Sequence, residues 1–267
     1  MSLNPKNYAS INKQNWNKRT ELHVHSKFYD HEAFKKGKSS LNEIELNLLG
    51  SVKGKKILHL QCHFGQDSIS LARLGADVVG LDISDKAIEI AIHQAETENA
   101  KAKFICYSVY DLPKEYFHQF DIVYSSYGVI GWLPDINKWA SVIANALKPN
   151  GQFVFVEFHP IVWMFDNEFN SVTYNYNKSE PIIETEKGSY ANTITNEIIE
   201  SISWNHGLAE VIDSLLKNGL ILNDFREYDY SPYNCLQQME EYESNKFRIK
   251  KFGNKIPLVY SLVCNKS

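Results

Sequence analysis

The sequence predicts an α/β protein in which a parallel sheet is covered by helices on both faces. The first observation is a short apolar run at residues 57–60, which is followed by a tight polar turn ending at Gly65 and by a helix-like apolar run. The second is that strand-like runs alternate with amphipathic helical segments as far as residue 158, which is typical of a doubly wound sheet. The third is that this alternation stops at Pro160, which indicates an insertion.

The expected elements of the alternating part follow from apolar periodicity and from capping residues. Ser40 and Glu43 have the spacing of a capping box, and Ser84 and Asp135 are suited to N-cap the helices that they precede. Residues 148–151 are expected to form a turn. Strands are expected at residues 57–60, 78–82, 104–107, 120–125 and 153–158, and helices at 41–49, 68–74, 84–95 and 135–147.

The flanking segments lack this regular pattern. Residues 7–29 mix polar and aromatic side chains without a clean helical period, so a short helix and a loop are expected there. Short alternating pieces at residues 172–176 and 198–204 predict β-hairpin character in the insertion, which we interpret as a cap over the site. Further along, a helix is expected at 208–216, strands at 220–228 and 258–264, and irregular structure at 232–252.

The simplest organisation is a single domain, because no repeat or low-complexity segment divides the chain. Its parts would be an N-terminal lid segment at residues 1–40, a ligand-binding core at 41–159, a cap insertion at 160–204 and a C-terminal part of the sheet at 205–267.

Composition excludes several function classes. A chain of 267 residues with 43% hydrophobic residues can bury a large core, and a net charge of -4 gives no basic footprint for nucleic acid. No apolar run approaches the roughly 20 residues that span a bilayer. The N-terminus lacks the apolar core of a signal peptide, and the four cysteines form no C-x-x-C pair. We therefore expect a cytoplasmic protein with no metal site and no nucleic-acid or membrane partner.

Four polar features follow successive predicted strands, at the sheet edge where open α/β sheets bind ligands. The turn at Gly65 offers backbone N–H groups and a helix N-terminus. Asp82 ends the second strand and could accept hydrogen bonds from the ribose hydroxyls of an adenosine cofactor; the alternative is a charge that favours the next helix N-terminus. Residues 108–111 could bracket an adenine, and residues 125–128 would line the pocket where a second substrate meets the cofactor.

Together these residues resemble the class I S-adenosylmethionine-dependent methyltransferases, in particular the small-molecule branch. The family's glycine-rich first motif corresponds to His59–Gly65 and its acidic residue to Asp82. Its Phe-Asp-x-Val strand corresponds to Phe120–Val123, and its Leu-Lys-Pro-Gly-Gly turn to Leu147–Gly151. The resemblance is close over residues 53–160. It implies a Rossmann-like seven-stranded sheet, mostly parallel, with an antiparallel last strand.

The resemblance also implies S-adenosylmethionine as the cofactor and S-adenosylhomocysteine as its product. Gln61 and His63 stand where the family has glycine, so we expect a differently shaped turn in which side-chain hydrogen bonds could replace backbone contacts. This variant first motif looks like that of an uncharacterised bacterial subgroup. The residues expected at the cofactor are Gln61, His63, Gly65, Gln66, Asp67, Asp82, Ile83, Ser108, Val109 and Ser125.

Methyl transfer needs a base only if the acceptor must lose a proton. The candidate catalytic residues are Glu157 and His159, which end the fifth strand, and Tyr127, which follows the fourth; a structural, hydrogen-bonded histidine is an equally simple interpretation of His159. The leading hypothesis is an enzyme that methylates a small-molecule acceptor. The altered first motif also allows a non-catalytic sensor or partner subunit that binds S-adenosylmethionine. A nicotinamide oxidoreductase is a third option, although the G-x-G-x-x-G pattern is missing.

Overall fold

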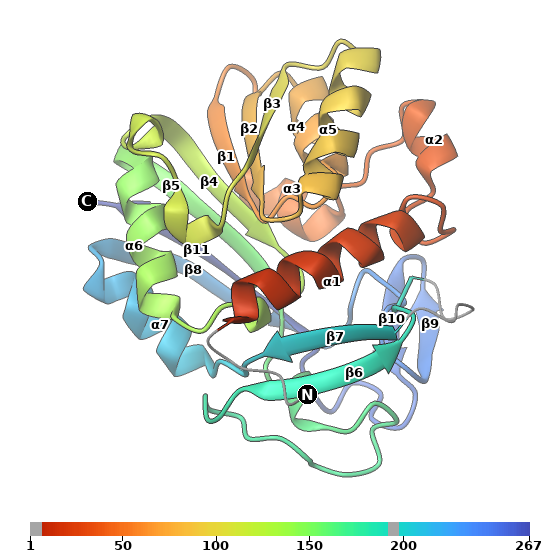
Figure 1. The fold of residues 1–267 in the computed structure, drawn as a ribbon. Coiled ribbons are helices and arrows are strands. Elements are labelled where there is room, and N and C mark those ends of the chain that lie inside the picture. Colours follow the sequence, from red (N-terminus) through yellow and green to blue (C-terminus); the bar gives the residue numbers. More distant parts are fainter. Residues whose placement is uncertain (1–6, 192–197) are drawn as a thin grey trace.

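The computed structural model describes residues 7–191 and 198–267, and its centre is a seven-stranded sheet (Figure 1). The strand order is β3-β2-β1-β4-β5-β11-β8. The five strands from β3 to β5 run parallel, and β11 is antiparallel to both of its neighbours. The predicted fold class is thereby confirmed. The strands are β1 Lys56–Leu60, β2 Asp77–Asp82, β3 Ala102–Cys106, β4 Phe120–Ser126, β5 Leu147–Phe158, β8 Leu220–Tyr228 and β11 Val259–Lys266.

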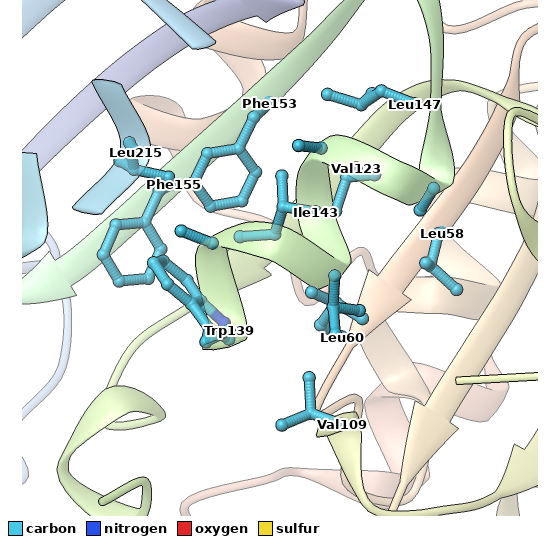
Figure 2. Close-up of a cluster of buried hydrophobic side chains, with 14 of the residues drawn as sticks. Leu58, Leu60, Val109, Val123, Trp139, Ile143, Leu147, Phe153, Phe155 and Leu215 are labelled. Atoms are coloured by element: carbon cyan, nitrogen blue, oxygen red, sulfur yellow. The ribbon is translucent and has the colours of Figure 1, made fainter. Parts of the chain in front are cut away.

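Both faces of the sheet are buried, as expected for a doubly wound arrangement. In β1, Leu58 belongs to an apolar cluster with the helices α6 and α7, whereas its neighbour Ile57 belongs to a second cluster with α3 and α4. Figure 2 shows the first cluster, in which Trp139 lies against Phe153 and Phe155. The helices are α3 Glu43–Leu49, α4 Gln66–Arg73, α5 Asp85–Thr97, α6 Ile136–Ala146 and α7 Leu208–Lys217, with 3₁₀ turns at Val109–Asp111, Lys114–Tyr116, Ile130–Trp132 and Val162–Met164.

Most of the predicted capping is confirmed. The Ser84 hydroxyl accepts from the Ala87 N–H, and the Asp135 carboxylate accepts from the Lys138 N–H. The predicted capping box is wrong by two residues, because it consists of Asn42 and Glu45. Its proposed N-cap residue, Ser40, instead donates its hydroxyl to the Asp67 carboxylate at 2.6 Å.

The predicted turn at residues 148–151 is part of β5, which is assigned as strand from its first residue at Leu147. The pairing with β4 is irregular there, with a register shift between Phe120 and Ile122. Asn150 has a left-handed backbone with φ 61°. A turn-like sequence is therefore accommodated as an irregularity within a strand, rather than as a break before it.

The insertion contains a hairpin of β6 Ile182–Lys187 and β7 Ile198–Ser203, which are antiparallel. The strand expected at residues 172–176 is a wrong prediction. Among the described residues of this segment, β pairing is limited to an isolated bridge between Phe165 and Val172. Residues 192–197, which the sequence placed in the cap, and residues 1–6 of the N-terminal segment lie outside the described residues.

The irregular segment expected at residues 232–252 is also wrong, because it contains a second hairpin of β9 Met239–Glu243 and β10 Lys246–Ile249. Most of β9 is exposed, and it carries charged residues on both sides. Its sequence therefore shows no alternation of apolar and polar residues that would predict a strand. Ile249, at the end of β10, is fully buried and anchors this hairpin to the body of the protein.

The N-terminal segment forms a longer helix than expected, α1 Tyr8–His23, followed by α2 His31–Lys35. Figure 1 shows α1 lying across the molecule between the hairpin of β6 and β7 and the helix α5. The Asn12 amide both donates to the Ile202 carbonyl at 2.8 Å and accepts from the Ile202 N–H at 3.0 Å. Because its buried side chains are polar, this helix has no hydrophobic period for a sequence to reveal. No helix among the described residues is long and apolar enough to cross a membrane.

Candidate functional site

A cavity of about 1260 Å³ lies at the carboxyl ends of β1, β2 and β4. Its volume exceeds the roughly 300–1,000 Å³ of a typical small-molecule pocket, so a cofactor and a second substrate could share it. Its floor is formed by the turn between β1 and α4 and by residues 126–133, and its roof by α1 and the hairpin of β6 and β7. Many of its side chains are aromatic, including Tyr8, Trp16, Tyr29, Phe64, Tyr127, Trp132, Trp163, Trp204 and Tyr233.

The turn between β1 and α4 has three residues with left-handed backbone: Gln61 (φ 55°), His63 (φ 52°) and Gly65 (φ 82°). A Cβ atom on Gly65 would lie 2.7 Å from the Phe104 ring and 2.9 Å from Ala91, so glycine is required there. Gln61 and His63 keep the conformation that glycine adopts freely, which costs an L-residue about 1–2 kcal/mol. The residues that replace the family's glycines thus stay within glycine-like backbone geometry.

The side chains of these two residues leave polar atoms in the cavity wall without partners among the described residues. The Gln61 amide donates to the Val129 carbonyl at 2.8 Å, and its oxygen is buried and unpaired. Both ring nitrogens of His63 are also buried and unpaired, while its ring stacks on Tyr29 with centroids 5.4 Å apart. Burial, together with the nearby Arg19 charge, lowers the pKa of His63 to about 3, so the ring is neutral. Such unpaired groups could be satisfied by a ligand.

Asp82 ends β2 inside the cavity and is only 8% exposed. One carboxylate oxygen accepts from the His63 N–H at 2.8 Å and the other from the Ser84 N–H at 2.8 Å. Burial raises the pKa of Asp82, while these backbone donors oppose the shift. Since a carboxylate oxygen has two acceptor sites, each one retains capacity for a further donor such as a ribose hydroxyl.

The remaining cofactor candidates, apart from Ser125, line two parts of the cavity. Ile83, Ser108 and Val109 line the cavity beside Asp82, and Gln66 and Asp67 line it from the first turn of α4.

Ser125 is different, because it is fully buried, with its hydroxyl 3.5 Å from the Leu60 carbonyl, and it does not line the cavity. Its neighbour Ser126 lines the cavity instead, since successive side chains of a strand point to opposite faces.

The three catalytic candidates lie in different surroundings. Glu157 lines the cavity, but its carboxylate accepts from the N–H groups of Val129 at 2.8 Å, Ile130 at 3.2 Å and Phe158 at 2.6 Å, and from that of Gly128. These donors fix the loop after β4 and engage both carboxylate oxygens. Burial raises the pKa of Glu157, while the backbone donors oppose the shift. His159 lies outside the cavity lining and pairs with Glu227 at 2.9 Å. Tyr127 lines the cavity, and its hydroxyl donates to Glu45 at 2.8 Å.

Sequence reasoning expected a lid in the N-terminal segment, and α1 does lie over the cavity; what it missed is Arg19. Arg19 is buried there; its Nε donates to the Asn15 side chain at 2.7 Å and its guanidinium pairs with Glu186 at 3.2 Å. The same guanidinium lies 5.8 Å from the ring centroid of Trp16 and 5.6 Å from that of Trp132. The aromatic residues at positions 8 and 16 were the signal for a lid, but nothing near position 19 indicates that this arginine would be buried in it.

Among residues 7–191 and 198–267, no three histidine, cysteine or acidic side chains come together as a metal ion would require. Cys62, Cys106, Cys235 and Cys264 are all free thiols.

Comparison with known proteins shows what the core of the chain is similar to. Residues 57–151 match the family model described as a methyltransferase domain. The chain is 29% identical over 134 residues to a ubiquinone biosynthesis O-methyltransferase of Bordetella avium, covering 49% of this chain and 55% of the relative. It is 33% identical over 131 residues to an uncharacterized methyltransferase of Synechocystis sp., covering 48% and 59%. The chain thus spans little more than half the length of these curated relatives.

Solved structures are similar in fold over a longer range. A geranyl diphosphate C-methyltransferase from Streptomyces coelicolor A3(2) superposes with a TM-score of 0.62 at 12% identity, covering 99% of this chain and 98% of that one. An S-adenosylmethionine-dependent methyltransferase from Methanosarcina mazei gives a TM-score of 0.58 at 20% identity, covering 85% and 98%. Residues 57–151 thus match a methyltransferase domain, and the chain has the fold of the class I S-adenosylmethionine-dependent methyltransferases.

Proposed function

We propose that this protein is an enzyme that transfers a methyl group from S-adenosylmethionine to a small-molecule acceptor. The observation that carries the proposal is the buried Asp82 carboxylate, which faces the cavity beside the turn between β1 and α4. S-adenosylmethionine supplies an electrophilic methyl group: the acceptor forms a bond to its carbon while the carbon–sulfur bond breaks and its electron pair returns to sulfur, leaving S-adenosylhomocysteine.

The residues present fit this cofactor. Asp82 has acceptor capacity for two ribose hydroxyls, and Ser108 and Val109 offer a polar group and an apolar wall for the adenine. The unpaired atoms of Gln61 and His63 could bond to the polar methionine part, in place of the backbone contacts that glycines would allow. Gly65 keeps the turn tight against Phe104.

The acceptor would occupy the part of the cavity under the insertion. Its walls there are aromatic, with Trp163, Phe165 and Trp204 from the insertion and Tyr233 from the segment before β9. This lining favours an acceptor with an apolar or aromatic body. The cap and the N-terminal lid would exclude water from it. A cytoplasmic location stays a prediction.

Calorimetric titration of the purified protein with S-adenosylmethionine and S-adenosylhomocysteine tests the proposal. We expect dissociation constants well below millimolar for both. Asp82→Ala should weaken binding by about 1–3 kcal/mol, the usual cost of losing hydrogen bonds to a charged group. Asp85→Asn is the matched control, because Asp85 is an exposed carboxylate three residues away at the start of α5. If the protein binds neither compound, the proposed function is contradicted. If Asp82→Ala binds with unchanged affinity, Asp82 does not bind the ribose.

A non-catalytic S-adenosylmethionine sensor or partner subunit is the second candidate. It is favoured by one observation, the replacement of two motif glycines by Gln61 and His63. The Gln61 amide donates to the Val129 carbonyl, and the His63 ring stacks on Tyr29. A sensor would bind the cofactor yet methylate no acceptor from a broad metabolite panel. A thermal-shift comparison of NAD with S-adenosylmethionine separates both candidates from an oxidoreductase.

A further inference from the structure

A buried carboxylate lies directly behind the cavity wall. Glu45, in the first turn of α3, is 0% exposed and does not line the cavity. Its Oε1 accepts from the Asn42 N–H at 2.7 Å and from the Asn42 side-chain amide at 3.1 Å. Its Oε2 accepts from the Tyr127 hydroxyl at 2.8 Å. Tyr127 therefore connects the cavity with a carboxylate that solvent does not reach.

Tyr127 is held in an unusual backbone conformation. It follows the last residue of β4 with φ 45°, which is uncommon for a bulky side chain. Its N–H donates to the Val156 carbonyl at 2.7 Å, and its ring packs edge-to-face on Tyr233 with centroids 5.0 Å apart. Backbone strain of this kind clusters at functional sites, where the surrounding structure fixes one side chain in place. Here it fixes the phenol between the cavity and Glu45.

The groups around Glu45 favour proton uptake near neutral pH. Burial, with a further contribution from the Asp67 charge, raises the pKa of Glu45 to about 7. The bonds from Asn42 and Tyr127 oppose this rise. Besides Asp67 on α4, the titratable groups that face Glu45 are the phenols of Tyr124 and Tyr127 from β4 and its end and of Tyr233 from the segment before β9; burial raises the pKa of all three well above the usual value. Burial also raises the pKa of Asp67, but Glu45 is the carboxylate that accepts a hydrogen bond from the Tyr127 hydroxyl.

We infer that Tyr127 and Glu45 form a proton relay that deprotonates a phenolic methyl acceptor in the cavity. In the relay, the acceptor hydroxyl gives its proton to Tyr127 Oη while the Tyr127 proton passes to Glu45 Oε2. The electron pair released on the acceptor oxygen forms the new bond to the methyl carbon as the carbon–sulfur bond breaks. Tyr127 touches the acceptor and is the catalytic residue, and Glu45 acts through it. This inference rests on the proposed function.

A phenol suits the relay better than other hydroxyl compounds. A phenol has a pKa near 10, about three units above that of Glu45, so a base of this strength can remove the proton as methyl transfer proceeds. An aliphatic alcohol is a far weaker acid. A phenol also matches the aromatic lining of the cavity next to Tyr127, which includes Tyr233 and Phe158.

The structural alternative is that Glu45 serves solely as the capping-box residue of α3. Glu45→Gln separates the two roles, because glutamine also occurs in capping boxes and its oxygen can accept from the Asn42 N–H. Its NH₂ group can donate to Tyr127 Oη, so the contact persists with reversed direction. What glutamine cannot do is accept a proton. Glu43→Gln is the matched control, because Glu43 is an exposed carboxylate in the same turn.

The first test needs no acceptor. Carbon-13 NMR of protein labelled at glutamate side-chain carboxyls should show one resonance that titrates with a midpoint near pH 7. It should be missing from Glu45→Gln and present in Glu43→Gln. Tyr127→Phe should move the midpoint upward, since it removes a hydrogen bond that favours the charged carboxylate. If every glutamate titrates below about pH 6, Glu45 is ionised throughout and the relay is overturned.

The second test compares acceptors that need a base with acceptors that do not. Catechol and unsubstituted phenol represent acceptors that must lose a proton, and thiophenol represents an acceptor that is already ionised near neutral pH. Production of S-adenosylhomocysteine from the phenols should fall on the order of 100-fold in Glu45→Gln and in Tyr127→Phe, the usual size of acid–base effects. Turnover of thiophenol and the affinity for S-adenosylmethionine should stay at the wild-type level.

The outcomes separate failure of the relay from failure of the proposed function. Equal losses for phenols and thiophenol would mean that Glu45 is structural. A protein that binds S-adenosylmethionine but turns over no phenol would overturn the acceptor class and leave the methyltransferase proposal intact. A protein that does not bind the cofactor fails the earlier proposal instead.

Discussion

The left-handed backbone at His63 predicts an inverted order of stability for two small replacements. At an ordinary helical position, alanine is more stable than glycine by roughly 1 kcal/mol. At φ 52°, a Cβ atom costs about 1–2 kcal/mol. Glycine has no such cost, but it loses more conformational entropy on folding, which destabilises it by roughly 0.5–1 kcal/mol. Both replacements lose the same ring contacts with Tyr29 and Trp16. His63→Gly should therefore be more stable than His63→Ala by about 0.5–1 kcal/mol, the difference between these terms.

Urea unfolding of the two variants, with equal m-values as a check on two-state behaviour, measures this difference. Gln61→Gly and Gln61→Ala should give the same order, because the φ of Gln61 is 55°. The control pair is Glu89→Gly and Glu89→Ala at an exposed position inside α5, where alanine should be the more stable. If alanine is also more stable at position 63, the turn does not store the strain that its backbone indicates.

Three further outcomes follow from other contacts. Gly65→Ala should destabilise the protein by about 2 kcal/mol or more, as overpacking does, because the new Cβ would lie 2.7 Å from Phe104; urea unfolding close to wild type would contradict this. Burial raises the pKa of Glu45 in the folded protein to about 7, above its usual value of 4.5, so its stabilising effect is complete below pH 4.5 and is lost as pH rises through 7. Wild type should therefore lose up to about 3 kcal/mol more than Glu45→Gln between pH 4.5 and 8 in unfolding experiments, and parallel pH profiles would refute the raised pKa. Asn12→Ala should cost about 2 kcal/mol for two hydrogen bonds and speed amide exchange at Ile202; unchanged protection at Ile202 would show that the bonds are not needed.

The parallel part of the fold could be predicted because each element there has its own local signal. Ser84 and Asp135 cap their helices as expected, since an N-cap bond needs only residues three positions apart. The apolar run at residues 57–60 is buried on both faces, so it reads as a continuous hydrophobic strand. Asp82 could be located for the same reason, because it directly follows such a run.

The parts that could not be predicted depend on contacts between distant residues. The polar side chains of α1 are buried because β7 offers backbone groups to them some 190 positions later in the chain. Glu45 lies behind the cavity because α3 packs against β5, and no pattern near residue 45 indicates a partner at Tyr127. Ser125 was expected in the pocket because the strand end was identified correctly, but which of two adjacent serines faces it depends on register.

The hydrogen bonds between α1 and the hairpin of β6 and β7 also have a consequence for the order of folding. Helix α1 is the first described helix to be synthesised, yet a polar helix of 16 residues is marginal by itself in water. Its strand partner is also weak alone, because isolated two-stranded hairpins are seldom stable. Helix α1 is therefore stabilised by its contacts with the hairpin and with α5, and its contact with the hairpin joins residues far apart in the chain, which makes it late and slow to form. We expect the sheet to form first and the roof of the cavity to assemble in the last step, so a newly folded molecule would pass through a state with an open site.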